Sequence, residues 1–175
     1  LWAVEIAGAL GRLNSIQLQQ KLDDAQTMLA HFDELTAEVQ LWIDRNQPEL
    51  LNMERGHIAA YGTHYPTALE GVLKMYETFH KPLSAYELEE LIHGPQMAFD
   101  AKTYLYFIAS NEFERSRIPL FLDWIKENEV TEHVFVFYHD QQTTSPKDLH
   151  FHSPIAQDLS PLAFVVPFQL MAARN

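Results

Sequence analysis

The sequence predicts an α/β fold, a three-layer sandwich in which helices cover both faces of a mostly parallel sheet of five strands. Two observations lead to this prediction. After about residue 56, short apolar runs alternate with helical segments of about ten or more residues, which implies parallel strands joined by right-handed crossovers. Two of the runs, TYLYFIA at 103–109 and HVFVFY at 133–138, are continuously apolar, as expected for strands covered on both faces.

Helices are expected ahead of this sheet. Apolar residues recur at helical spacing in residues 1–10 and again in 22–43. Gly11 and Asn14 predict a break between two helices, and the second run is long enough to bend or divide near Asp33. The segment QPELLNMERG then predicts a short helix and a turn that lead into the first strand.

The first strand–helix unit of the sheet follows directly. The apolar run His57–Tyr61 predicts a strand that ends at Gly62, and Pro66 suits the first turn of the helix that comes next. A second strand is expected at 84–88, followed by a short helix or turn over 89–99.

The C-terminal half continues the alternation. Asn111 predicts the cap of an amphipathic helix that ends near Glu129. A shorter strand is expected at 149–152, after the polar turn DQQTTSPKD. The chain closes with a predicted helix over 160–173, in which Pro167 should cause a kink or mark a packed bend.

Composition limits the function classes. A chain of 175 residues is expected to form one domain that buries roughly 70% of its unfolded surface. Twelve Lys and Arg against 24 Asp and Glu give a formal charge of −12, which disfavours binding to nucleic acid or anionic lipid. No apolar run approaches the ~20 residues of a membrane span. The absence of cysteine fits a reducing cytoplasm and excludes thiolate chemistry.

The stretch Tyr65–Pro95 carries the candidate chemistry. Glu70, Lys74 and Glu77 are four and three residues apart, so they share one face of the predicted helix. Such a stripe is most often a solvated, self-pairing surface. In the functional alternative, a sheltered carboxylate beside an ammonium group takes and returns a proton near neutral pH.

Two further segments belong to the candidate site. The loop of Gly62, Thr63 and His64 is expected to bind substrate, because ligands of such folds sit beyond the carboxyl ends of the strands. His93 precedes Gly94-Pro95, which fixes a turn and makes the position of the imidazole reproducible, although a histidine near a turn is more often a packing or surface residue.

Other reaction classes have little support in the sequence. Among nine histidines, only His150 and His152 share one side of a predicted strand, and no third ligand has suitable spacing, so no metal is predicted. The sequence contains no G-x-S-x-G elbow, Walker A loop or G-x-G-x-x-G turn.

The motif ALEGVLKMYE, with ELIHGP after it, resembles the sugar-isomerase (SIS) domain family. The resemblance is to the second SIS subdomain of the isomerase half of glucosamine-6-phosphate synthase, which carries an ALEGALKxxE helix and an ExxHGP turn, and to the related fructosamine-6-phosphate deglycases. The spacing of 16 residues from Glu77 to His93 matches without a gap, and LSPLAFVVPFQLMA resembles the closing helix of that family.

The resemblance implies roles for individual residues. Glu77 would move a proton between C1 and C2 of an open-chain ketose phosphate, Lys74 would tune that carboxylate, and Glu70 would support it. His93 would shuttle the proton that opens the sugar ring and would reach the site of the neighbouring subunit, which implies a homodimer. Glu90 would orient the turn. No cofactor is implied.

Departures from the family pattern set further expectations. The family holds phosphate in a Ser/Thr-rich loop of a preceding SIS subdomain, and no such loop occurs in this sequence. We therefore expect a longer protein, in which residues 1–50 are a helical lead-in from an upstream subdomain and residues 51–175 form an SIS subdomain.

The reaction itself stays open between related choices. The YELEE segment before the HGP turn is closer to the deglycases, which split fructosamine 6-phosphates. Isomerisation and C–N cleavage begin with the same proton transfer, so the sequence does not separate them. The alternatives are a non-catalytic module that binds or senses sugar phosphates and a structural dimerisation module.

Overall fold

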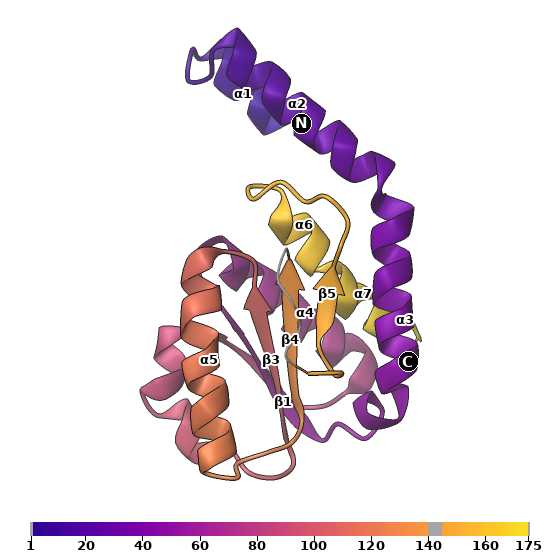
Figure 1. Ribbon diagram of the computed structural model, residues 1–175, viewed down its shortest axis with the longest axis vertical. Helices are drawn as coiled ribbons and strands as arrows, with labels where there is room; N and C mark the ends of the chain where they lie inside the picture. Colours follow the sequence, from indigo (N-terminus) through magenta and orange to yellow (C-terminus); the bar gives the residue numbers. More distant parts are fainter. Residues whose placement is uncertain (1, 140–144, 175) are drawn as a thin grey trace.

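Five parallel strands form the centre of the computed structural model, which describes residues 2–139 and 145–174 (Figure 1). The strand order is β2-β1-β3-β4-β5, and every neighbouring pair is parallel. The predicted five-stranded α/β sheet is therefore confirmed. The strands are β1 (Arg55–Ala60), β2 (Leu83–Glu87), β3 (Thr103–Ala109), β4 (Val134–His139) and β5 (Leu149–Phe151).

Helices cover both faces of this sheet and extend beyond it. Side chains of α3, α4 and α7 pack on one face, and those of α5 and the short η2 turn pack on the other. The helices are α1 (Trp2–Ala9), α2 (Ser15–Ala30), α3 (Phe32–Leu50), α4 (Tyr65–Phe79), α5 (Glu112–Glu127), α6 (Ser160–Phe164) and α7 (Val166–Arg174), with 3-10 turns η1 (Gly62–His64), η2 (Glu89–Ile92) and η3 (Pro95–Ala98).

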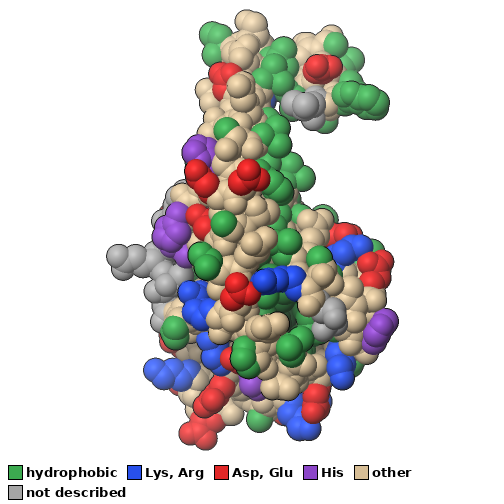
Figure 2. Space-filling view, turned by 90° about the vertical axis from the view of Figure 1, so that its right-hand side faces the viewer, with side chains coloured by type: hydrophobic (Ala, Val, Ile, Leu, Met, Phe, Trp, Pro, Cys, Tyr) green, Lys and Arg blue, Asp and Glu red, His purple; other side chains and the backbone are tan. Residues whose placement is uncertain are grey.

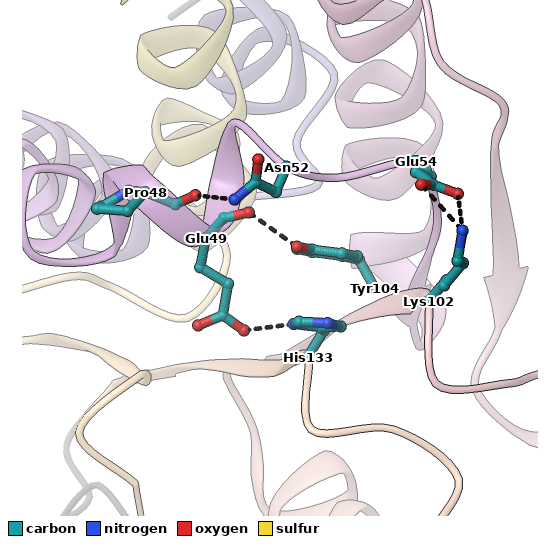
Figure 3. A pocket seen from close by; sticks show the side chains of 7 residues that line it. All are labelled: Pro48, Glu49, Asn52, Glu54, Lys102, Tyr104 and His133. Carbon is teal, nitrogen blue, oxygen red and sulfur yellow. Dashed lines mark hydrogen bonds and ion pairs between the residues drawn. The ribbon is translucent and has the colours of Figure 1, made fainter.

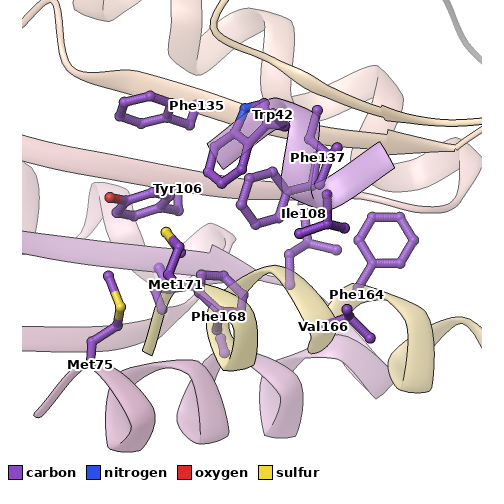
Figure 4. Close-up of a cluster of buried hydrophobic side chains, with 14 of the residues drawn as sticks. Trp42, Met75, Tyr106, Ile108, Phe135, Phe137, Phe164, Val166, Phe168 and Met171 are labelled. Carbon is purple, nitrogen blue, oxygen red and sulfur yellow. The ribbon is translucent and has the colours of Figure 1, made fainter. Parts of the chain in front are cut away.

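The larger core is rich in aromatic rings (Figure 4). Trp42 of α3 meets Phe135 and Phe137 of β4 edge-on, with ring centroids 5.9 and 5.1 Å apart. Phe168 of α7 reaches the same cluster from the other side, 5.4 Å from Phe137. The Trp42 indole is buried and its N–H donates to the carbonyl of Lys147 at 2.6 Å, so its polar atom is satisfied. These contacts hold α3 and α7 against the sheet.

Helix α4 lies unusually close to the sheet. A Cβ added at Gly71 would lie only 2.9 Å from Cδ1 of Ile58 on β1 and from ring carbons of Phe168. Ala68, Val72 and Met75 complete the buried side of the helix. This packing leaves the opposite side of α4, with the Glu70, Lys74 and Glu77 stripe, facing outward.

The predicted helix boundaries are corrected in two places. Helix α3 continues through Pro48 to Leu50, so the separate short helix expected from Gln47 is wrong. Burial of Asn46 and Leu50 keeps this segment helical despite the missing proline N–H, and the amide of Asn46 donates to the carbonyl of Trp42 at 2.9 Å.

The predicted closing helix is divided into α6 and α7 at Val165. Pro167 stands in the first turn of α7, where a proline needs no N–H donor, so it helps to begin a helix instead of kinking one. The break expected near Asp33 occurs at His31. Residues 140–144 of the predicted polar turn lie outside the described residues.

An arm formed by α1, α2 and the start of α3 projects away from the sandwich (Figure 1). Hydrophobic side chains follow it (Figure 2), among them the exposed Trp2, Ile6, Leu10 and Ile16. An ion pair between Lys21 Nζ and Asp158 Oδ2, 2.5 Å apart, joins α2 to the segment before α6. No helix in residues 2–139 and 145–174 is long and apolar enough to span a membrane.

Candidate active site

The three charged residues of α4 meet as the sequence predicts. Lys74 Nζ lies 2.6 Å from Glu77 Oε2 and 3.8 Å from Glu70 Oε1. The hydrogen bond from Lys74 to Glu77 raises the pKa of the lysine, and the charges of the two glutamates act in the same direction. The side chain of Glu77 is 51% exposed. In this chain alone, the carboxylate is therefore paired but not sheltered.

A row of large apolar side chains runs beside this charged stripe. Leu69, Leu73 and Tyr76 are 48%, 48% and 47% exposed and follow helical spacing, each one position before Glu70, Lys74 and Glu77. The Tyr76 hydroxyl donates to the carbonyl of Leu83 at 2.6 Å and fixes the end of α4 to β2. The charged stripe thus lies on an amphipathic face that the described residues leave uncovered.

His93 lies in a tightly bonded turn between η2 and η3. Its backbone N–H donates to the carbonyl of Glu90 at 3.1 Å, and Gly94 adopts a φ of 134° that favours glycine. Glu90 therefore contributes to the turn through its backbone. The neighbouring Glu89 makes a two-point ion pair with Arg117 of α5, at 2.6 and 2.9 Å, which the sequence did not suggest.

The side chain of Gln96 is the second feature that sequence reasoning missed. Its Nε2 donates to the carbonyl of Ile92 at 2.5 Å, and its Oε1 accepts from the N–H of Gly94 at 2.8 Å. The two bonds bracket His93, whose side chain is exposed. A glutamine directly after Gly94-Pro95 is the sequence signal that could have indicated this contact.

The predicted substrate loop divides into exposed and buried parts. Gly62, with a φ of 55°, and Thr63 are exposed at the carboxyl end of β1. His64 is fully buried, its Nε2 lies 2.9 Å from Ser160 Oγ, and its ring meets Phe164 edge-on. Burial lowers the pKa of His64 to about 4. His64 therefore fixes the loop to α6 from within the core.

The corner between the carboxyl ends of β1 and β3 is filled by the chain's own side chains. The rings of Tyr61 and Phe113 pack 4.2 Å apart across it. Beneath them, the buried Glu114 carboxylate accepts from the N–H groups of Ser110 and Asn111 at 2.7 and 3.1 Å. Burial raises the pKa of Glu114, although these hydrogen bonds act in the opposite direction. Two backbone donors just before α5 that an anion could use, those of Ser110 and Asn111, are thus occupied by a carboxylate.

Glu77 and His93 lie on different sides of the edge strand β2. Helix α4, with Glu77, covers the face of the sheet that carries the aromatic core, whereas η2 packs on the other face through the buried Leu91. The amide of Leu88 donates to the carbonyl of Ala60 at 2.9 Å, which places the start of η2 at the carboxyl edge, next to the Gly62 loop. Within a single copy of this chain, Glu70, Lys74 and Glu77 therefore lie together on α4, and His93 lies apart from them.

A cavity of about 390 Å³ lies away from all of these residues, between the end of α3 and the starts of β3 and β4 (Figure 3). His133 stacks on Tyr104 and approaches Glu49 Oε1 at 2.6 Å, and Lys102 pairs with Glu54 on the far side. Within the described residues, no group of three or more histidine, aspartate or glutamate side chains could hold a metal ion.

Comparison with known proteins relates the sequence to one enzyme. No family model matches the chain. A glutamine–fructose-6-phosphate aminotransferase (isomerizing) from Xanthomonas campestris pv. campestris is 33% identical over 145 residues, which are 81% of this chain and 23% of that protein. The corresponding protein of Buchnera aphidicola subsp. Baizongia pistaciae is 32% identical over 114 residues, which are 63% of this chain and 18% of that protein. The chain thus spans less than a quarter of these relatives.

Solved structures share the fold over nearly the whole chain. A protein assigned as a phosphosugar isomerase from Clostridium difficile 630 has a TM-score of 0.85 at 25% identity, over 97% of this chain and 47% of that one. A protein assigned as a sugar-binding protein from Salmonella typhimurium LT2 has a TM-score of 0.81 at 27% identity, over 98% of this chain and 52% of that one. With the sequence relatives, these matches show that the chain is an SIS domain that resembles the isomerase domain of glutamine–fructose-6-phosphate aminotransferase.

Proposed function

We propose that this chain supplies the acid–base residues of a phosphosugar isomerase or deglycase, acting on a fructose 6-phosphate-like or fructosamine 6-phosphate substrate. The observation that carries the proposal is the contact of 2.6 Å between Lys74 and Glu77 on an outward face of α4. A carboxylate next to a fixed ammonium group can accept a proton and return it.

Glu77 does the chemistry in this proposal. Its carboxylate removes the proton from C1 or C2 of the open-chain sugar, so that a C–H bond breaks and a carboxyl O–H bond forms. The electron pair moves into a C1–C2 double bond, and the carbonyl oxygen (or imine nitrogen) takes up a proton from water, which gives an enediol or enolamine. The same carboxyl group then returns its proton to the neighbouring carbon while the hydroxyl proton of the first carbon leaves to water, so that a carbonyl forms there. Lys74 holds the carboxylate in place and, with Glu70, keeps the local charge nearly balanced.

The site needs a cover. A half-exposed carboxylate is a weak base in water, and exclusion of water strengthens both its basicity and its interaction with Lys74. The uncovered apolar row of Leu69, Leu73 and Tyr76 supports a partner surface at this place. The chain spans only about half of its two solved neighbours, which supports an upstream SIS subdomain, linked through residues 1–50, as the cover.

His93 serves a second copy in this proposal. Because β2 lies between His93 and Glu77, the imidazole is better placed to reach a neighbouring chain than its own Glu77. A homodimer would then give each site the Glu77 of one copy and the His93 of the other. In this proposal the exposed Gly62 and Thr63 contact the substrate. Because the corner at Glu114 is filled, we place the binding site for the phosphate group outside this domain.

The test is Glu77→Gln in the full-length protein, assayed on fructose 6-phosphate and on a fructosamine 6-phosphate. Loss of a general base is expected to lower kcat about 10²- to 10⁴-fold, with an unchanged melting temperature because the side chain is exposed. Glu54→Gln is the matched control, since Glu54 also pairs with a lysine at the surface. Unchanged turnover of both substrates by Glu77→Gln would contradict the proposal.

A second candidate function is binding of a sugar phosphate without catalysis. It is favoured by the similarity to the Salmonella typhimurium sugar-binding protein. In that case the full-length protein would bind fructose 6-phosphate in calorimetry but would not exchange its C1 proton with solvent. Proton exchange that depends on Glu77 would exclude this candidate.

A further inference from the structure

The turn that presents His93 is held by one side chain. The amide of Gln96 donates to the carbonyl of Ile92 at 2.5 Å and accepts from the N–H of Gly94 at 2.8 Å. Ile92 and Gly94 are the residues directly before and after His93. A single planar group therefore fixes the peptide units on both sides of the histidine.

The other described contacts of the turn do not restrain the backbone on both sides of His93. Gly94 has a φ of 134° and nothing within 4 Å of the place where a Cβ would stand, so side-chain packing does not restrain it. The other backbone bonds, from His93 to Glu90 and from Met97 to Gly94, close the 3-10 turns on either side but do not span the histidine. The two hydrogen bonds of the Gln96 side chain, which we call the Gln96 bracket, connect the peptide units before and after His93.

We propose that Gln96 is a positioning residue for His93: its two hydrogen bonds fix the backbone around the histidine and so determine where the imidazole is presented. The expected effect of Gln96 on catalysis rests on the function proposed for His93, whereas its two hydrogen bonds do not depend on that function. One net hydrogen bond changes the ratio of the closed turn to the open turn about two- to tenfold. Loss of both bonds of Gln96 should therefore increase the opening of this exposed turn by a measurable amount.

The first measurement concerns the turn alone. In Gln96→Met, which keeps the length of the side chain and removes both bonds, hydrogen exchange at the Gly94 amide of the full-length protein is expected to become about tenfold faster. Gln96→Glu keeps an acceptor for Gly94 but loses the donor to Ile92, so an intermediate rate is expected. Met97→Ala, at an exposed neighbouring position, is the control and should leave the rate unchanged. Unchanged Gly94 exchange in Gln96→Met would overturn the proposal.

The second measurement tests whether Gln96 acts through His93. Gln96→Met is expected to lower kcat about tenfold with little change in KM or melting temperature. In a His93→Ala background the same substitution should cause no further loss, because the group that it positions is gone. An equal loss in both backgrounds would overturn the positioning role.

The two proposals fail in different ways. If His93→Ala leaves turnover unchanged while Gly94 exchange still responds to Gln96→Met, the assignment of His93 is wrong and the bracket stands. If His93→Ala lowers turnover and Gln96→Met changes neither exchange nor kcat, the bracket is wrong and the function proposed for His93 stands.

Discussion

Two regions of this domain each contain a notable glutamate, and the two glutamates lie in opposite environments. At the corner of β1 and β3, Glu114 is fully buried and accepts three hydrogen bonds, two from Ser110 and one from Asn111. On α4, Glu77 is half exposed and pairs with one lysine side chain, that of Lys74. The corner where doubly wound folds commonly bind ligands is closed by packing, while the candidate chemistry faces outward.

The two glutamates are expected to differ in what they contribute to the stability of the domain. At the closed corner, the hydrogen bonds to Glu114 Oε2 contribute to stability, because the buried donors of Ser110 and Asn111 would be costly to leave unpaired. An outward face with charged and apolar residues contributes little to the stability of its own domain. Under the proposed function, Glu114 has a structural role and Glu77 a chemical one, and substitutions can tell the two roles apart.

The largest expected effect compares the two glutamates directly. Glu114→Ala removes the acceptor of the Ser110 and Asn111 amides and should destabilise the protein by about 3 kcal/mol. Glu77→Ala should change the free energy of unfolding by less than about 0.5 kcal/mol. Urea unfolding measures both values, and similar values for the two variants would remove the distinction between the regions.

Two buried histidines are also expected to make the fold sensitive to acid. Burial lowers the pKa of His64 to about 4 from its ordinary value of 6.5, so the unfolded chain binds a proton more readily than the folded one. The stabilisation is complete above pH ~6.5 and is lost as the pH falls toward 4. His57, whose pKa is also lowered to about 4 mainly by burial, acts in the same direction.

The contribution of His64 should fall by about 2 kcal/mol between pH 7 and pH 5. Urea unfolding at the two pH values measures it. In His64→Gln, which can still bond to Ser160 but does not titrate, the difference between pH 7 and pH 5 should shrink by that amount. An unchanged difference would show that His64 is not protonated on unfolding.

The two sides of α4 should respond differently to small changes. Gly71→Ala places a methyl group 2.9 Å from Ile58 and Phe168 and should destabilise the protein by about 1–2 kcal/mol, after the gain in helix propensity is included. Leu73→Ala, on the side that is exposed in this chain alone, is the control, and in residues 1–175 without other chain it should change stability by less than about 0.5 kcal/mol. Thermal unfolding compares them, and a larger loss for Leu73→Ala would mean that the exposed side is already packed.

The smallest expected change in stability is that of Lys74→Ala. An exposed ion pair contributes little, so the free energy of unfolding should change by less than about 0.5 kcal/mol. Under the proposed function, turnover should nevertheless fall about tenfold, because the ammonium group that holds the Glu77 carboxylate is lost. A loss of stability without a loss of turnover would make the stripe a structural feature and reverse the comparison.

The sequence predicted the sheet because its signals are local. The runs at 103–109 and 133–138 and the cap at Asn111 became β3, β4 and the start of α5 within one or two residues. Continuous apolar runs and capping residues are recognised from residues that are close in sequence, and the observed strands and helix agree with them. The spacing of Glu70, Lys74 and Glu77 predicted their contact for the same reason.

The parts that the sequence did not predict depend on contacts between distant segments. The burial of His64 depends on Ser160 and Phe164, nearly one hundred residues away. The closed corner depends on Tyr61 meeting Phe113 across two strands. Gln96 is an exception, because its two bonds stay within four residues, and they were missed because they depend on the geometry of the turn. Whether a polar residue faces inward or outward is decided by tertiary packing, and periodicity alone does not determine it.

The three tryptophans of the chain mark three separate environments. Trp2 on the arm is 83% exposed, Trp42 in the aromatic core is 1% exposed, and Trp124 on the outer side of α5 is 36% exposed. Indole fluorescence shifts to the red and is quenched by dissolved iodide when the ring meets water. Variants that keep one tryptophan each would therefore make the arm, the core and the outer side of α5 visible as separate optical signals in one protein.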